Sequence, residues 1–148
     1  MTVAGHRARR LAALGAVGAC LALPASGGAS APSHSTFFES PSRNIGCVIL
    51  DGTARCDIAK RSWTPPPRPS SCPSEVDYGQ GLTVSRTGAP ALVCAGDTAL
   101  DPNAPILAYG QLETIGVMRC ASTLAGMTCR STRSGHGFFV SRQRYSLF

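Results

Sequence analysis

Asn44-Ile-Gly-Cys-Val-Ile-Leu-Asp-Gly-Thr-Ala-Arg-Cys-Asp-Ile58 contains Asp51-Gly52, the preferred two-residue turn of a β-hairpin. Folding the chain at this turn pairs Leu50 with Thr53 and places Cys47 opposite Cys56. With the Leu50 and Thr53 pair hydrogen-bonded, the cysteines occupy a non-hydrogen-bonded pair, where side chains lie close enough for a disulfide. The register predicts that one face of the hairpin belongs to the core, formed by Ile45, Cys47, Ile49, Ala54, Cys56 and Ile58.

Four further cysteines are predicted to form two more disulfides. Cys120 and Cys129 have the same spacing as the first pair, and a four-residue loop, Thr123 to Gly126, would bring them opposite each other. The residues that flank the two hairpins match weakly, so the sequence leaves open whether the hairpins are a repeat. By elimination Cys72 pairs with Cys94, although only the first of the three pairings has support from strand register.

The remainder of the chain also favours β-structure. Frequent Gly and Pro, with no long apolar period of 3.6 residues after residue 31, argue against a helical domain. Further strands are expected at 82–85, 91–94, 114–119 and 138–141. The predicted fold class is therefore all-β, a small disulfide-braced barrel or sandwich built from β-hairpins.

Residues 1–31 have the pattern of a secretory signal peptide. A basic start precedes an apolar run at 11–23, which is too short to span a bilayer comfortably, and small residues follow from Ala25 to Ala31, where cleavage is expected. A retained membrane anchor is the alternative. Residues 32–148 are predicted to be one secreted domain, because no interval is long or polar enough to separate two cores.

Cys20 is the one cysteine outside the three predicted pairs. Val17-Gly-Ala-Cys20 resembles the short box before the lipidated cysteine of bacterial lipoproteins, but the next residues stay apolar. We therefore expect Cys20 to leave with the signal peptide. A lipid anchor on Cys20, holding the protein at the outer face of the cytoplasmic membrane, is the alternative localisation. If residues 1–31 do not stay as an anchor, the sequence predicts membrane attachment only through Cys20.

Charge is distributed unevenly along the chain. The whole sequence holds 14 Lys and Arg against 8 Asp and Glu, and three of the arginines lie in the predicted signal peptide. Residues 113–148 hold five arginines against Glu113 alone. These arginines predict a patch for an anionic partner such as an envelope component, with nucleic acid unlikely, or else a solvated strand face. They are Arg119, Arg130, Arg133, Arg142 and Arg144.

A proline-rich stretch, Trp63-Thr-Pro-Pro-Pro-Arg-Pro69, separates the two hairpins. It is incompatible with a helix or a central strand and should run extended. We expect a rigid connection with prolines packed on Trp63. A proline-rich ligand for the aromatic groove of a partner is the alternative.

The sequence offers little support for catalysis. His136 is the histidine expected inside the domain, and Asp97 or Asp101 with Ser141 would complete the residue types of a hydrolase. No Gly-x-Ser-x-Gly motif is present, and paired cysteines leave no thiol nucleophile. Asp97, Asp101 and Asn103 lack the spacing of a calcium loop, and turns around Pro102 explain them better. No catalytic residue, metal site or cofactor is therefore predicted, with His136 as the weak candidate.

Several short motifs also point to a known family. They are Ser40-Pro-Ser-Arg-Asn-Ile-Gly-Cys47, Arg55-Cys-Asp-Ile58, Trp63 before the prolines, Cys94-Ala-Gly-Asp-Thr98, Tyr109-Gly110, and Gly135-His-Gly-Phe138 through Ser141-Arg142. Together they resemble a family of small secreted actinobacterial proteins that is classed as a domain of unknown function, and the resemblance covers about residues 36–148. Arg43 stands where the usual form, Ser-Pro-Ser-Gly-Asn, has glycine. The resemblance implies export and a disulfide framework, and it brings no catalytic residues.

Three functions are compatible with these features. We expect a secreted or envelope-associated binding or structural module that is not an enzyme, whose ligand the sequence leaves unknown. A secreted inhibitor or competition protein is one alternative, with an extracellular protein as its partner. A small hydrolase that uses His136 is the other.

Overall fold

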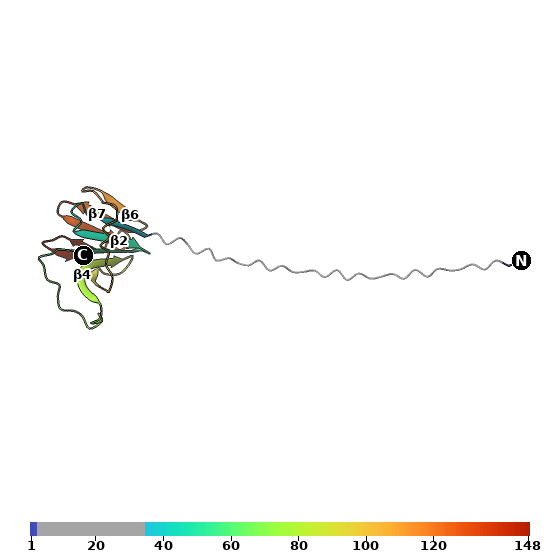
Figure 1. Cartoon of the computed structure of the whole chain (residues 1–148), viewed down its shortest axis with the longest axis horizontal. Helices are drawn as coiled ribbons and strands as arrows, with labels where there is room; N and C mark the ends of the chain where they lie inside the picture. The colour runs from blue at the N-terminus through green and yellow to red at the C-terminus, as the bar shows by residue number, and fades with distance from the viewer. Residues whose placement is uncertain (3–34) are drawn as a thin grey trace. The chain divides into compact units, whose positions relative to one another are not determined.

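Two antiparallel sheets of five strands each form the domain (Figure 1). The computed structural model describes Met1, Thr2 and residues 35–148. The first sheet has the order β1-β2-β3-β4-β5, with β1 (Ser35–Glu39), β2 (Ile45–Leu50), β3 (Thr53–Ile58), β4 (Asp77–Ser85) and β5 (Ala91–Ala95). The second has the order β10-β9-β8-β7-β6, with β6 (Leu112–Ile115), β7 (Met118–Thr123), β8 (Gly126–Ser131), β9 (Gly137–Val140) and β10 (Tyr145–Leu147). The fold is all-β and sandwich-like, which confirms the predicted class.

The described residues contain no helix that is long and apolar enough to cross a membrane. Apart from Met1 and Thr2, the predicted signal peptide lies outside the described residues, and so does Cys20. Both therefore stay predictions.

The hairpin formed by β2 and β3 has the predicted register. Leu50 pairs with Thr53 and Cys47 with Cys56. Asp51 and Gly52 have φ angles of 49° and 78°, the left-handed backbone that this type of two-residue turn requires. The two cysteines form a disulfide with their Cα atoms 4.0 Å apart, the short spacing of a non-hydrogen-bonded pair. All six residues predicted to face the core are buried.

The second hairpin, formed by β7 and β8, has a shorter loop than predicted. Thr123 pairs with Gly126 inside the ladder, so the turn consists of Leu124 and Ala125 alone. Gly126 permits this tight connection because its φ of 149° is accessible mainly to glycine. Cys120 and Cys129 are opposite each other and form a disulfide, as predicted.

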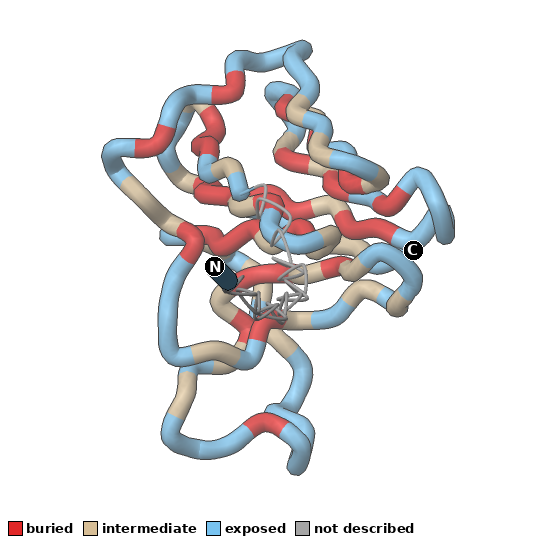
Figure 2. Tube along the Cα trace, turned by 90° about the vertical axis from the view of Figure 1, so that its right-hand side faces the viewer, coloured by how far each residue is buried: buried red, intermediate tan, exposed pale blue. Residues whose placement is uncertain are grey.

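A single hydrophobic core fills the space between the two sheets. Figure 2 shows buried stretches running through the middle of the domain, with exposed loops around them. The sulfur atoms of Cys56 and Cys129 lie 3.5 Å apart, so the disulfides of the two hairpins touch inside the core. Disulfide bonding thus contributes to packing between the sheets as well as to each hairpin.

The two sheets repeat one structural plan. In each sheet, the five strands lie side by side in chain order. A disulfide joins the second strand to the third, and three residues separate each of its cysteines from a two-residue turn. The following strands carry related sequences, Gly81-Leu-Thr-Val-Ser-Arg86 and Gly137-Phe-Phe-Val-Ser-Arg142. Leu82 pairs with Cys56 as Phe138 pairs with Cys129. The hairpins are therefore an internal structural repeat, a question that the sequence had left open.

One predicted strand is wrong and two strands were missed. Residues 114–119 do not form a single strand, because Gly116 takes a φ of 58° and turns the chain between β6 and β7. β1 and β10 were not predicted. Each lies at the edge of its sheet and pairs with one other strand, so its sequence needs less apolar character than a central strand.

The proline-rich stretch lies in the segment between β3 and β4, which projects at the lower end of the domain in Figure 1. Trp63 donates from Nε1 to the Ser141 carbonyl and packs on Tyr145, with ring centroids 4.6 Å apart. Trp63 is thus packed on Tyr145, Pro65 lies against Gly79, and the packing of prolines on Trp63 stays a prediction. The Cys72–Cys94 disulfide also ties this segment to β5.

Arg43 adopts the left-handed conformation at the turn between β1 and β2, with a φ of 54°. Glycine is favoured there, but Arg43 gains compensating contacts. Its guanidinium donates to Glu39 at 2.9 Å and to the Pro102 carbonyl at 2.8 Å. Because the Glu39 side chain is buried, this ion pair satisfies a carboxylate that would otherwise be costly inside the protein.

Ser122 is a weak point of the core. It occupies the position in the second hairpin that Ile49 occupies in the first, and its buried hydroxyl has no hydrogen-bond partner among the described residues. We predict that Ser122→Ala raises the free energy of unfolding by about 1 kcal/mol, because it removes an unsatisfied polar group. Urea denaturation measures the change.

Ser131→Ala is the matched control. Ser131 is equally buried, but its hydroxyl donates to the Arg86 carbonyl at 2.7 Å, so this variant should be less stable than the wild type. A loss of stability in Ser122→Ala as well would contradict the prediction.

Candidate functional site

The outward face of the second sheet carries three of the five predicted patch arginines. Arg119 on β7 and Arg130 on β8 are directly opposite each other, and both are exposed. The Arg144 guanidinium lies 4.5 Å from the centroid of the Phe139 ring on β9. Within the described part of the chain, none of these three arginines forms an ion pair. We call this surface the basic face.

A shallow groove of about 300 Å³ crosses the basic face. Ala121 and Thr128 form its floor, since their short side chains leave space between the larger neighbours. Arg119 and Arg130 line one side, and Leu112, which is 47 % exposed, lies at the rim. The atoms that line the groove are almost all apolar, so the two arginines contribute mainly the carbon atoms of their side chains to it.

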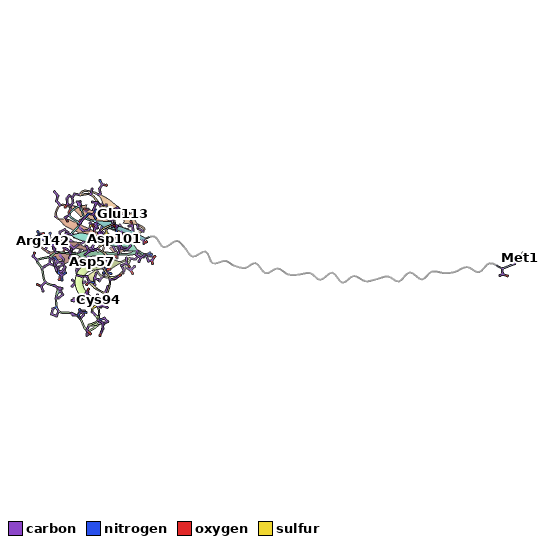
Figure 3. All side chains as sticks on the ribbon, in the orientation of Figure 1. Met1, Asp57, Cys94, Asp101, Glu113 and Arg142 are labelled. Atoms are coloured by element: carbon purple, nitrogen blue, oxygen red, sulfur yellow. A yellow bond between two sulfur atoms is a disulfide. The ribbon has the colours of Figure 1, made fainter. Side chains whose placement is uncertain are left out.

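The other two predicted patch residues lie elsewhere. Arg133 and Arg142 line two separate clefts, neither of which includes a residue of the groove. Figure 3 labels Arg142 at the left edge of the domain, away from Glu113 of β6. The five arginines are thus distributed over the basic face and two other clefts.

The corresponding face of the first sheet is covered by the chain itself. The covering segment (residues 96–107) lies over Gly46 of β2, where an added Cβ would be 2.6 Å from the Ala99 carbonyl oxygen. Farther along, Glu39 of β1 exchanges two backbone hydrogen bonds with Pro105 and Leu107. One outward face of the sandwich is thus occupied at this row of residues. In the equivalent row of the other sheet Arg119 and Arg130 are exposed, and Phe148 lies against Gly137.

Arg55 holds the covering segment in place. Its guanidinium makes two hydrogen bonds to Asp57, at 3.0 and 2.7 Å, and another to Asp97, at 2.6 Å. Asp57 is almost completely buried and accepts from the Ala99 backbone at 2.9 Å. The hydrogen bond and charge of Arg55 lower the pKa of Asp97 below its usual value. These contacts assign Arg55 and Asp57 a structural role.

Sequence reasoning missed this ion-pair network. The sequence feature that could have revealed the network is the Arg55-Cys-Asp57 spacing, which places two opposite charges on the same face of a strand. Asp97 had been considered as a partner of His136 or as a metal ligand. Its position opposite Arg55 depends on a loop, which strand register does not predict.

The residues of the hydrolase hypothesis are not assembled into a catalytic group. His136 is exposed, and its side chain makes no hydrogen bond to another described residue. The Ser141 hydroxyl donates to the Arg144 carbonyl, while Asp97 binds Arg55. Asp101 accepts from the Asn103 backbone at 2.9 Å, the Asx turn expected beside Pro102. The geometry gives no support to the use of His136 in hydrolysis.

A cluster of sulfur atoms in the core does not amount to a metal site. The sulfur atoms of Cys47, Cys56 and Cys129 all lie within 4.8 Å of one another. Metal coordination requires thiolates, however, and each of these cysteines is in a disulfide. Their closeness reflects the packing of the two hairpins.

Comparison with known proteins supports a family but no activity. No curated protein and no solved structure matches the chain. A family model described as a family of unknown function, DUF6636, matches residues 15–148. Three disulfides in a domain of this size are typical of extracellular proteins. The match covers nearly the whole chain, and the protein therefore belongs to the DUF6636 family of unknown function.

Proposed function

We propose that the protein is a non-catalytic binding module whose basic face holds an anionic polymer of the cell envelope. One observation carries this proposal. The row of the first sheet that contains Gly46 and Asp57 is covered by the chain itself, whereas Arg119 and Arg130 in the equivalent row of the second sheet are exposed and positively charged.

The electrostatics of the basic face favour an anionic partner. Like charges directly opposite each other in an antiparallel pair destabilise a sheet, so Arg119 and Arg130 are an unfavourable pair without a counterion. A phosphate or carboxylate between the two guanidinium groups would relieve the repulsion and accept charge-assisted hydrogen bonds from both. Arg144, held over Phe139, would extend the contact along a polymer.

Export is part of the same proposal. The predicted signal peptide and the three disulfides support secretion into an oxidising compartment. There the basic face would meet polymers that carry phosphate or carboxylate groups. Lipidation of Cys20 is the alternative, and it would keep the same face at the membrane surface.

The double variant Arg119→Gln with Arg130→Gln tests the proposal. We expect the wild type to bind immobilised polyphosphate in a salt-sensitive manner, and the double variant to bind at least about tenfold more weakly with a shallower salt dependence. Retention measured over a range of salt concentrations gives both quantities.

A charge-matched control separates the basic face from net charge. Arg86→Gln with Arg133→Gln removes two positive charges that line a different cleft, so its affinity should stay close to that of the wild type. Equal weakening in both double variants would show that net charge alone drives retention. Unchanged binding in the Arg119 and Arg130 variant would overturn the proposal.

A further inference from the structure

Two clefts of the same size lie at equivalent positions of the internal repeat. Each measures about 390 Å³. The first lies beside the turn of the second hairpin, at Leu124 and Ala125, and the second lies beside the turn of the first hairpin, at Asp51 and Gly52. Each is closed by the turn between the first two strands of the other sheet, so both form where the two halves of the domain meet.

Both clefts contain two basic residues, again at equivalent positions. Arg142 in the first cleft and Arg86 in the second each end the repeated Gly-x-x-Val-Ser-Arg sequence. Lys60 in the first corresponds to Arg133 in the second, since each lies two residues beyond the third strand of its own sheet. The same pair of positive charges has thus been kept in two clefts whose other residues differ.

Hydrogen bonds position the two cations of the first cleft. The Asn44 side chain donates to the Lys60 carbonyl at 3.0 Å and accepts from the Lys60 amide at 2.9 Å. The Arg142 carbonyl accepts from both the amide and the hydroxyl of Ser62, at 2.8 and 3.1 Å. The backbones that carry both charges are therefore fixed, while neither side chain forms an ion pair with a described residue.

The first cleft differs from the second in its remaining lining. Asp51 lines the second cleft, alongside the apolar residues Ile115 and Val117, and supplies a negative charge there. The first cleft has no carboxylate, and most of its other side chains are hydroxyl or amide groups. These are Ser40, Ser42, Asn44, Tyr109, Thr123 and Gln143, with Ser141 beside Arg142. Of these side chains, Tyr109 and Gln143 make no hydrogen bond to another described residue, whereas Asn44 and Thr123 already bond the backbone. The first cleft therefore combines two positive charges with two polar side chains that are free to bind a ligand.

We propose that the first cleft binds a phosphorylated sugar between Lys60 and Arg142. A phosphate monoester carries close to two negative charges near neutral pH, which matches two cations without a carboxylate. Arginine binds phosphate through its planar fork and lysine as a point charge. The Tyr109 hydroxyl and the Gln143 amide suit sugar hydroxyls, and the cleft has the volume of a small-ligand site. This site is separate from the basic face and does not depend on it.

Titration with glucose 6-phosphate tests the site, followed by NMR of backbone amides and by calorimetry. We expect signals from Ser42, Asn44 and Thr123 to shift, and Lys60→Gln and Arg142→Gln each to weaken binding about tenfold or more. Glucose should bind much more weakly because it lacks the charge. Inorganic phosphate should also bind more weakly, because it lacks the hydroxyl groups of a sugar.

Variants outside the cleft serve as controls. Arg133→Gln in the second cleft, and the Arg119 and Arg130 double variant of the basic face, should bind glucose 6-phosphate as the wild type does. The proposal would be overturned by the absence of shifts at millimolar ligand, by unchanged affinity in both cleft variants, or by equal losses in Arg133→Gln. Equal affinity for inorganic phosphate would overturn the assignment of a sugar.

Discussion

Replacing Cys120 and Cys129 together by alanine is expected to lower the free energy of unfolding by about 4 kcal/mol, the largest effect that we predict for this protein. Two contributions add. Loss of the cross-link frees the unfolded chain, and loss of two fully buried sulfur atoms leaves a cavity beside the disulfide of the first hairpin. Denaturant unfolding of the purified double variant measures the loss.

The Cys72→Ala and Cys94→Ala double variant is the informative comparison. Loop entropy alone would make it the more damaging by about 0.8 kcal/mol, because its disulfide spans 22 residues rather than 9. Cys94 is exposed, however, and only Cys72 is buried, so less packing is lost than at Cys120 and Cys129, and we expect a smaller total cost of about 3 kcal/mol. A larger loss at Cys72 and Cys94 would show that contact between the central disulfides adds nothing to the core.

Gly81→Ala and Gly137→Ala are expected to cost about 2 to 3 kcal/mol each. An added Cβ would collide with the Cys56 carbonyl oxygen in the first case and with the Cys129 carbonyl oxygen in the second. Both obstacles are backbone atoms of a disulfide-bonded strand, so neither can move aside cheaply. Thermal unfolding of the two variants, analysed at a common temperature, provides the measurement.

Gly96→Ala provides the control for these substitutions. Its Cβ would meet only the Val76 side chain at 3.6 Å, an ordinary contact, and the variant should differ from the wild type by less than about 0.5 kcal/mol. Because Gly81 and Gly137 are equivalent in the repeat, their costs should be similar. A large cost at one of them alone would contradict the equivalence of the two halves.

Local chemistry explains why the first hairpin could be predicted in detail. Asp51-Gly52 specifies a turn type, the turn specifies the register, and the register decides which residues face the core. The second hairpin lacks such a turn sequence, since Leu124 and Ala125 are poor indicators of a tight turn. Its disulfide was therefore predicted from spacing, and its loop was predicted too long.

The candidate site was only partly accessible from the sequence, for a similar reason. Clustering of arginines near the end of the chain indicated a basic region. The sequence did not separate Arg119 and Arg130, which lie on the basic face, from Arg133 and Arg142. Their positions depend on strand direction and on the turn between β6 and β7, which the sequence predicted to be part of a strand. The covering segment depends on long-range contacts, which no local pattern reveals.

The internal repeat gives the two surfaces a common interpretation. Where the halves are alike, as at Gly81 and Gly137 or at the two hairpin disulfides, the residues serve the fold. Where they differ, the second sheet has Arg130 in place of Asp57, and Arg130 is exposed whereas Asp57 is buried. The basic face is therefore the clearest departure from a structure that otherwise repeats itself.

NMR titration of the protein with polyphosphate tests the binding of an anionic polymer by the basic face most directly. We predict that amide signals on β7, β8 and β9 shift, with Arg119, Arg130 and Phe139 among them, while those of β2 and β3 stay unchanged. High salt should reverse the shifts. Shifts confined to the first sheet or to the cleft of Lys60 and Arg142, or no shifts at all, would contradict the proposed role of the basic face.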